Sequence, residues 1–264
     1  MIIFYFLIGL LTSIIGAIAG IGGGVIIKPI LDFLGHYDIG TISILSASSV
    51  LAMAVVSLSI MFITKKTKIN YKTSGLLAAA SMIGGFSGKK IFIYLIEYID
   101  NMEMIAFTQS IILTVLMSLI LIYHLMKHKL RVFQLQHPVA ILFIGFILGI
   151  TSAFLGIGGG PFNIAILTLG FSMQPKEASA NSIFIIFFSQ TSSLLTTTFT
   201  TGFSTFELDM LIYIVVGAII GGILGSALLA RLSHKYVDHV FTIATLIIVF
   251  VNIYNSLNTF PHFS

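Results

Sequence analysis

Two glycine-rich runs supply the groups in this chain that are best suited to bind an anion. The residues are Gly20, Gly22, Gly23 and Gly24 in the first run, and Gly156, Gly158, Gly159 and Gly160 in the second. Successive glycine amides can form a concave nest of N–H donors for an anion. The apolar residues after each run are expected to begin a helix, whose first amides lack partners and whose dipole is positive there. Two such ends facing each other would make a site of backbone donors.

The same runs predict where helices break, because glycine loses more backbone entropy on ordering than any other residue. Each run lies inside a long apolar stretch, and a break at membrane depth must face protein or a wet cavity. Glycine-interrupted apolar segments at matching places in two halves indicate a transporter's binding site. The alternative is that the glycines only let helices pack closely. The duplication favours the binding site.

A possible charged pair follows the first run. Lys28 lies four residues after Gly24, and Asp32 lies four residues further along. A charge inside a membrane segment is a candidate functional residue, which makes Lys28 a candidate substrate ligand. In the alternative interpretation, Lys28 pairs with Asp32 and extends its ammonium to the membrane surface. The second half has no charge at the matching place, but Pro161 suits a helix start and Asn163 adds a polar side chain.

Hydroxyl and amide side chains inside the second and sixth apolar segments are the next candidates. They are Ser48 and Ser49 in the second segment, and Asn181, Ser182 and Gln190 in the sixth. Such groups can donate to an anion, and they also join membrane helices to each other for about 0.6 kcal/mol each. Ala47-Ser48-Ser49 matches Ala180-Asn181-Ser182 in an internal repeat. The match keeps the binding role open beside the packing role.

The sequence lacks the residues that metal sites, nucleotide sites and common nucleophilic catalysis require. The chain has no cysteine, which excludes disulfides, thiolate metal sites and cysteine nucleophiles. Its seven histidines fall in expected loops or at segment ends, where surface positions are expected. No Gly-x-Ser-x-Gly or His-Glu-x-x-His motif is present, and no Gly-Lys-Ser/Thr follows the glycine runs. We expect no metal, cofactor or nucleotide site. A membrane-embedded enzyme or a scaffold subunit of a membrane complex is the alternative to a transporter.

The composition is that of an integral membrane protein. Of 264 residues, 57% are hydrophobic and 8% are charged, and the mean hydropathy is +1.09, whereas soluble domains carry about 25% charged residues. The sequence pI of about 9.2 comes from 13 lysines and arginines scattered over short loops. That pattern is typical of membrane orientation and not of nucleic-acid binding. A cleaved signal peptide is not expected, because residues 1–11 carry no positive charge.

Eight apolar segments are expected to be helical, and they divide into two equal sets. The segments are 2–34, 40–64, 73–91, 104–126, 138–170, 178–200, 207–230 and 237–257. The first and fifth exceed one span of about 17–25 residues and contain the glycine runs. The glycines of 84–88 in the third segment match those of 221–225 in the seventh. The predicted fold is an all-α integral membrane protein of two homologous four-segment repeats, 1–126 and 138–264, joined by a cytoplasmic linker, 127–137, in one membrane domain.

Counts of lysine and arginine predict the orientation. If the first and fifth segments each cross the membrane, one side holds seven of these residues and the other five. If both are re-entrant hairpins, Lys176, Arg231 and Lys235 join the first side, which gives ten against two with Lys28 embedded. The two are Lys89 and Lys90, at the start of an expected polar stretch, 89–103, outside the membrane. The positive-inside rule prefers the second arrangement, with six full spans, both termini outside and inverted repeats.

These motifs resemble the TauE/SafE family of sulfite and sulfoacetate exporters, within the toluene-sulfonate uptake permease group. The resemblance covers nearly the whole chain and includes Pro29, five residues after the first glycine run. Ala165 stands where the family usually has a second proline, and Asn181 stands where threonine is common. The resemblance implies a multi-pass transporter in the bacterial inner (plasma) membrane that exports sulfite, sulfonates or related organic acids. The inverted repeat places the expected site between the glycine runs near the midplane. The implied partners are a small anionic substrate and the lipid bilayer, without nucleic acid, and a homo-oligomer is possible.

Overall fold

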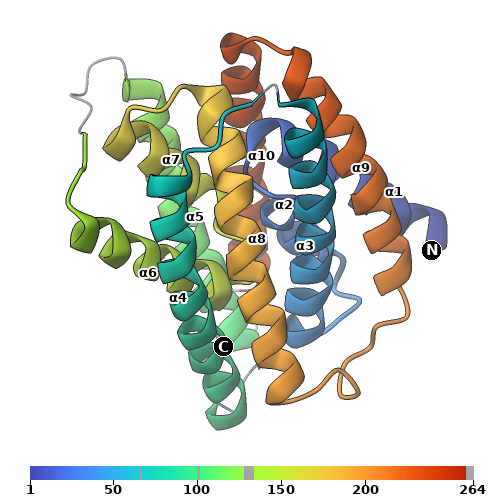
Figure 1. The fold of residues 1–264 in the computed structure, drawn as a ribbon. Coiled ribbons are helices and arrows are strands. Elements are labelled where there is room, and N and C mark those ends of the chain that lie inside the picture. Colours follow the sequence, from blue (N-terminus) through green and yellow to red (C-terminus); the bar gives the residue numbers. More distant parts are fainter. Residues whose placement is uncertain (66, 100–101, 128–133, 260–264) are drawn as a thin grey trace.

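The computed structural model describes residues 1–65, 67–99, 102–127 and 134–259, and these residues form an all-helical bundle (Figure 1). The helices are α1 (Ile2–Ala19), α2 (Gly24–Leu34), α3 (Ile39–Thr64), α4 (Tyr71–Tyr98), α5 (Met102–Met126), α6 (Pro138–Leu155), α7 (Gly160–Phe171), α8 (Pro175–Phe199), α9 (Leu211–Arg231) and α10 (His234–Thr259). The all-α membrane fold expected from composition is confirmed. Most of the expected linker, 128–133, lies outside the described residues.

Both glycine runs break a helix, as predicted. Helix α1 ends at Ala19 and α2 begins at Gly24, while α6 ends at Leu155 and α7 begins at Gly160. The residue that ends the first helix of each pair is left-handed, with φ of 72° at Gly20 and 66° at Gly156. An L side chain is disfavoured there, so glycine suits the turn. Pro161 lies in the first turn of α7, where a missing amide costs nothing.

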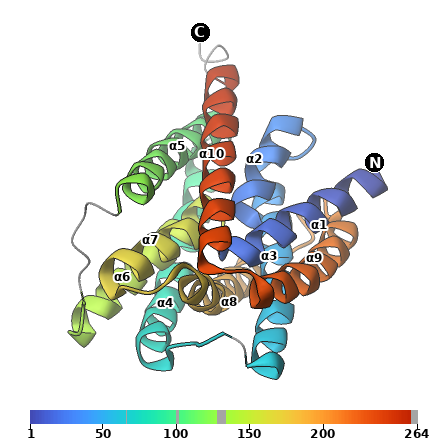
Figure 2. The same cartoon turned by 90° about the horizontal axis from the view of Figure 1, so that it is seen from above.

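The two halves of the chain pack through each other. Helix α1 lies mainly against α9, and α6 lies mainly against α4, so the first helix of each half packs on the third apolar segment of the other half. Figure 2 shows these two pairs on opposite sides of the bundle. Glycines allow the close approach: a Cβ on Gly225 would lie 2.6 Å from Ile14 O, and a Cβ on Gly88 would overlap Ile150 O. The matching glycines of α4 and α9 therefore serve packing.

The remaining contacts repeat when the halves are exchanged. Helix α3 packs on α9 as α8 packs on α4, and α3 and α8 contact each other in the middle of the bundle. Helices α5 and α10 pair with each other. In Figure 1, α4, α8 and α3 run side by side across the front of the molecule. The opposite membrane orientation of the two halves stays a prediction.

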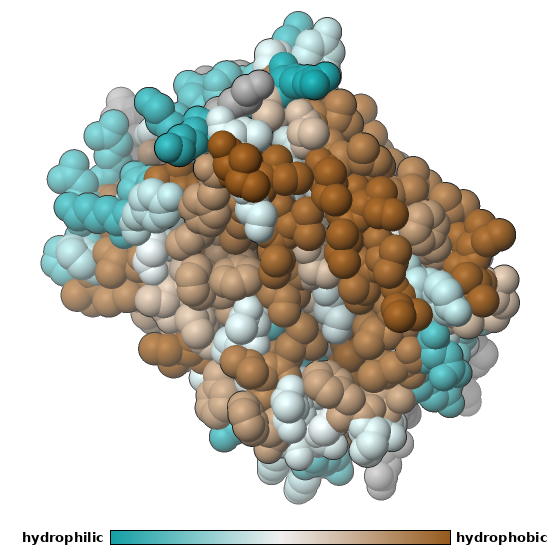
Figure 3. All heavy atoms as spheres, turned by 45° about the vertical axis from the view of Figure 1, so that its right-hand side comes forward, coloured by the Kyte–Doolittle hydropathy of each residue, from teal (hydrophilic) through white to brown (hydrophobic). Residues whose placement is uncertain are grey.

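Eight of the described helices are long and apolar enough to cross a membrane, all except α2 and α7. Figure 3 shows apolar side chains over much of one face, with hydrophilic residues gathered toward its edges. One expected boundary is wrong. The third segment continues to Tyr98 as α4, and Lys89 is a buried residue of that helix, not the start of an external polar stretch. Hydropathy alone suggested an end there, but the ammonium has partners inside the bundle.

Hydrogen bonds bring the lysine-rich segments to one end of the bundle. Asn70 N donates to Asn181 Oδ1 at 2.8 Å, which joins the start of α4 to the start of α8. Lys176 Nζ donates to Ala230 O at 2.9 Å, which joins α8 to the end of α9. Lys127 at the end of α5 pairs with Asp238 near the start of α10. Eight full spans would separate 65–72 from 176 and 231, and the six-span arrangement stays a prediction.

Candidate functional site

The two glycine runs meet at the centre of the bundle. A Cβ on Gly160 would overlap Ile21 O, and a Cβ on Gly24 would lie 3.1 Å from Ile157 O. Each run therefore contacts the isoleucine that lies within the other run. The N-terminal ends of α2 and α7 are brought together by this contact, as the repeat predicts. The contact is tight, and a ligand has no room between Gly160 and Ile21 in this conformation.

Two serines hydrogen-bond the glycine runs, each to the run of the other half. Ser46 Oγ of α3 donates to Gly156 O at 3.0 Å, and Ser182 Oγ of α8 donates to Gly20 O at 2.5 Å. Each hydroxyl also lies near a carbonyl of the run in its own half, Gly24 O for Ser46 and Gly160 O for Ser182. The two serines thus perform the same task in the two halves.

The first amides of the two short helices have no hydrogen-bond partner in the described part of the chain. Among the described residues, none accepts a hydrogen bond from the backbone N–H of Gly24 or of Gly160. Unpaired amides at a helix N-terminus attract negative charge. Two helix N-termini with unpaired amides therefore meet in a closed contact, and their role as an anion site stays a prediction.

Lys28 does not pair with Asp32 and does not reach the surface. Its side chain is 3% exposed, and Nζ donates to Leu155 O at 2.8 Å and to Gln109 Oε1 of α5. Gln109 Nε2 in turn donates to Phe154 O at 2.6 Å. The interpretation of Lys28 as a surface-seeking partner of Asp32 is wrong, because the carbonyls at the end of α6 and the Gln109 amide hold the ammonium inside.

A second buried lysine also lies near the second run. Lys89 of α4 is 4% exposed, its Nζ lies 3.1 Å from Ser43 Oγ, and it sits 4.8 Å from the centre of the Phe92 ring. The same hydroxyl of Ser43 would lie 2.9 Å from a Cβ on Gly156. Sequence reasoning missed Lys89 as a site residue. The signal was present, since Lys89 follows a glycine pattern that has a helical counterpart in the second half.

Some of the other predicted side chains lie near the glycine runs, and others do not. Gln190 is buried near the second run and its Nε2 donates to Ser152 Oγ at 3.3 Å, and Asn163 is buried in the first turn of α7. Ser49 donates to Ser46 O within its own helix, and Ser48 is half-buried beside it. Asn181 lies away from the runs, because its amide bonds Lys68 O and Ser74 Oγ at the lysine-rich end.

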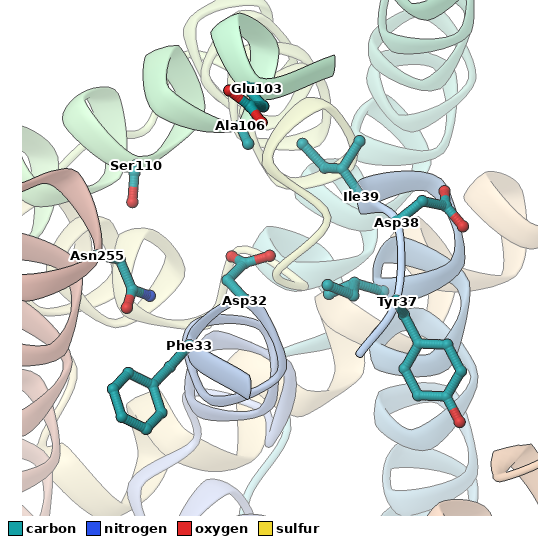
Figure 4. Close-up of a pocket in the computed structure, with 10 residues that line it drawn as sticks. Asp32, Phe33, Tyr37, Asp38, Ile39, Glu103, Ala106, Ser110 and Asn255 are labelled. Carbon is teal, nitrogen blue, oxygen red and sulfur yellow. The ribbon is translucent and has the colours of Figure 1, made fainter. Parts of the chain in front are cut away.

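An acidic cavity opens beyond Lys28, between α2, α5 and α10 (Figure 4). It measures about 260 Å³, and Asp32, Tyr37, Glu103 and Asn255 are among the residues that line it. Asp32 points toward α5, which carries Glu103 (Figure 4). Burial raises the pKa of Tyr37 to about 12, so its phenol keeps its proton near neutral pH.

One histidine departs from its expected surface position. His124 is 5% exposed, and its Nε2 lies 3.2 Å from Asp238 Oδ1, which also pairs with Lys127. The group ties α5 to α10 at the lysine-rich end. Within the described part of the chain, no three histidine or acidic residues gather as metal ligands would.

Comparison with known proteins gives one family. The family model described as "Sulfite exporter TauE/SafE" matches residues 5–252. The chain is 30% identical over 204 residues to the "Probable membrane transporter protein YunE" of Bacillus subtilis, a match that covers 69% of this chain and 72% of that protein. It is 28% identical over 193 residues to a probable membrane transporter protein of Methanocaldococcus jannaschii, covering 68% of this chain and 66% of that protein. No solved structure matches the chain.

Proposed function

Because the chain belongs to the TauE/SafE family of multi-pass membrane transporters, we propose that it exports small anions such as sulfite, sulfonates or related organic acids across the inner (plasma) membrane. The proposed substrate site lies between the N-terminal ends of α2 and α7, near the midplane. The glycine amides there supply hydrogen-bond donors, and Lys28 supplies positive charge beside them.

The observation that carries this proposal is the meeting of the two glycine runs beside buried positive charge. Two helix N-termini with unpaired amides come together at Gly24 and Gly160. Lys28 bonds Leu155 O, one residue before the second run begins. Donors and positive charge from several directions suit an oxyanion, which offers several acceptor oxygens. An interior made of neutral packing contacts would need no buried ammonium, which is costly to desolvate.

Transport requires that the closed contact opens. Gly160 lies directly against Ile21, so an anion can reach the amides only after the two runs have moved apart. Transporters built from repeats expose a fixed site to each side by moving one set of helices against the other. The crosswise bonds from Ser46 and Ser182 hold the runs together, and these bonds must break in that movement.

Flux measurements in proteoliposomes test the function. The purified protein is reconstituted, and uptake and efflux of labelled sulfite, sulfate, small sulfonates and small carboxylates are compared with those of empty liposomes. We expect saturable flux of at least one of these anions. A Gly23→Val variant should remain in the membrane and lose that flux, because a Cβ there would lie 3.1 Å from Ser13 Oγ of α1 and the added side chain would displace the N-terminal end of α2. Folded protein that moves none of the anions, or moves cations instead, would contradict the proposal.

A further inference from the structure

Lys89 forms part of a second pocket that the glycine runs do not reach. The pocket measures about 440 Å³, within the range of sites for small ligands. It lies at the end of the bundle opposite the lysine-rich end, where α4 finishes and α8 leads into α9 (Figure 1). Its lining includes Phe92, Ile96, Glu97, Thr205 and Phe206 in addition to Lys89. We refer to it as the Lys89 pocket.

The ammonium of Lys89 is not neutralised. It carries three donors, of which one is directed at Ser43 Oγ. The face of Phe92 gives it a further weak attraction. Among the described residues, no carboxylate lies within ion-pairing distance of it. Burying a charge without an opposite charge is costly, and an anion entering the pocket would remove part of that cost.

Two acidic residues line the pocket, and neither is directed at Lys89. Asp38 caps α3: its Oδ1 accepts from the amides of Gly40 and Thr41, and its Oδ2 accepts from the Thr41 hydroxyl. Glu97 is exposed at the solvent end of α4. Solvent and these donors screen both carboxylates. Lys89 is therefore the charge that dominates the buried part of the pocket.

The Lys89 pocket is connected to the glycine runs through one hydroxyl. Ser43 Oγ contacts Lys89 on one side and abuts Gly156 on the other. Among the described residues of the second half, the equivalent serine makes no such link. Ser179, which lies 136 residues after Ser43, abuts Gly20 but donates to Pro175 O in its own helix. Among the described residues, a pocket with a buried lysine linked to a glycine run therefore lies at only one end of the bundle.

We propose that the Lys89 pocket is an access site for the substrate, in which the Lys89 ammonium binds the charged group of a small organic anion on its way to or from the glycine runs. The apolar walls made by Phe92, Ile96 and Phe206 contact the rest of the anion. This inference rests on the proposed transport function, and it adds a charge-selecting residue outside the central site.

Cysteine chemistry tests the proposal directly, since the chain has no cysteine of its own. Thr205→Cys places one thiol on the pocket wall. The rate of its reaction with an anionic sulfonatoethyl methanethiosulfonate is compared with the rate for the cationic trimethylammonium analogue, each relative to a free thiol. We expect a preference for the anionic reagent, and we expect Lys89→Met to reduce that preference about tenfold, equivalent to about 1.4 kcal/mol.

Two controls separate charge from folding. Lys90 is the exposed neighbour of Lys89, with Nζ over the Phe86 ring, so Lys90→Gln should leave the preference unchanged. Lys89→Arg keeps the charge and should keep the preference. Methionine replaces the buried ammonium with an apolar side chain of similar length and so removes the cost of burying an unpaired charge. Should Lys89→Met misfold, loss of the preference in Lys89→Gln but not in Lys89→Arg carries the same information.

The outcomes distinguish this inference from the proposed function. An anionic preference that is the same with and without Lys89, or a cationic preference, overturns the access site whatever the flux shows. A Lys89-dependent preference in a protein that moves no anion would contradict the transport function and leave an anion-binding pocket. If flux is present, Lys89→Met should raise KM more than it lowers kcat. The reason is that Lys89 binds the anion before the anion reaches the glycine runs.

Discussion

Ser46 and Ser182, 136 residues apart, hold the same position relative to opposite glycine runs. Ser46 Oγ donates to Gly156 O at 3.0 Å, and Ser182 Oγ donates to Gly20 O at 2.5 Å. Each serine comes from a helix in the middle of the bundle and reaches into the break of the other half. The helix break in each half is therefore held by a serine from the other half, and neither half holds its own break alone.

The first prediction concerns these serines. Ser46→Ala or Ser182→Ala removes a donor from a buried carbonyl, which costs about 1–3 kcal/mol. Each variant should lower the thermal unfolding temperature of the purified protein in detergent. Ser49→Ala is the matched control, because Ser49 is equally buried but donates to a carbonyl of its own helix. Equal effects at all three positions would show that the bonds between the halves contribute no more to stability than a bond within one helix.

The second prediction concerns close contact between the runs. Gly160→Ala adds a methyl group that would overlap Ile21 O, and overpacking of this kind costs about 1–3 kcal/mol or more. Gly75→Ala, in the open first turns of α4 where a Cβ meets nothing within 4 Å, should stabilise by about 0.5–1 kcal/mol. The measurement is thermal unfolding with the yield of monodisperse protein. A tolerated Gly160→Ala would mean that the runs do not touch as described.

The third prediction concerns the contact between Lys28 and Gln109. Lys28→Met leaves Gln109 Oε1 and Leu155 O without their donor, and Gln109→Leu leaves Lys28 with one partner fewer. A double-mutant cycle on unfolding should therefore give a coupling energy of about 0.5–3 kcal/mol. Additive effects would contradict a direct contact. Pairing Lys28→Met with Ser110→Ala, one residue along α5, serves as the uncoupled control.

The elements of the fold were readable from the sequence, while the partners of its charged groups were not. Hydropathy and the glycine pattern give the helices and their two breaks, because a long apolar run and four glycines in five residues leave few alternatives. Lys28 and Lys89 show the limit. Their partners, Gln109 and Ser43, lie 81 and 46 residues away, and only the packed bundle reveals that they meet.

The repeat shows a second limit, in register. Matching Ala47-Ser48-Ser49 with Ala180-Asn181-Ser182 shifts the alignment by three residues relative to the glycine runs. The 136-residue spacing of the runs instead relates Ser46 to Ser182, and these two make the equivalent hydrogen bonds. Short patterns of small polar residues recur along a helix at three- and four-residue intervals. A sequence match between such patterns can therefore identify the equivalent helix without identifying the equivalent residue.

The fourth prediction concerns topology. Single cysteines in this cysteine-free chain should show Lys68→Cys and Ser233→Cys reacting from the cytoplasmic side, and Ser204→Cys reacting from outside, with membrane-impermeant reagents. The reasons are the ten lysines and arginines expected on one side against Lys90 on the other, with Lys89 buried in α4, and the bonds that join the starts of α4, α8 and α10. A reporter after Ser264 should read as external. Labelling of Lys68→Cys and Ser233→Cys from opposite sides would show eight full spans.

The last prediction concerns the driving force. Proton-coupled transporters usually carry acidic or histidine residues in the membrane, and Asp32, half-buried and directed into the acidic cavity (Figure 4), is the candidate here. An anion that leaves a cell with a negative interior needs no coupling ion. Each exported charge gains about 2.3 kcal/mol per 100 mV, roughly a fortyfold gradient at 1.4 kcal/mol per decade.

We therefore expect anion flux in proteoliposomes to follow an imposed potential and to persist after an ionophore collapses the pH gradient. Asp32→Asn should retain flux at a reduced rate, because the carboxylate faces the cavity and makes no ion pair with Lys28, whose Nζ donates to Gln109 and to Leu155 O. Glu103→Gln, on the opposite wall of the same cavity, controls for a change in cavity charge alone. Strict dependence on a proton gradient that disappears in Asp32→Asn, but not in Glu103→Gln, would identify Asp32 as a coupling residue and reject export driven by potential.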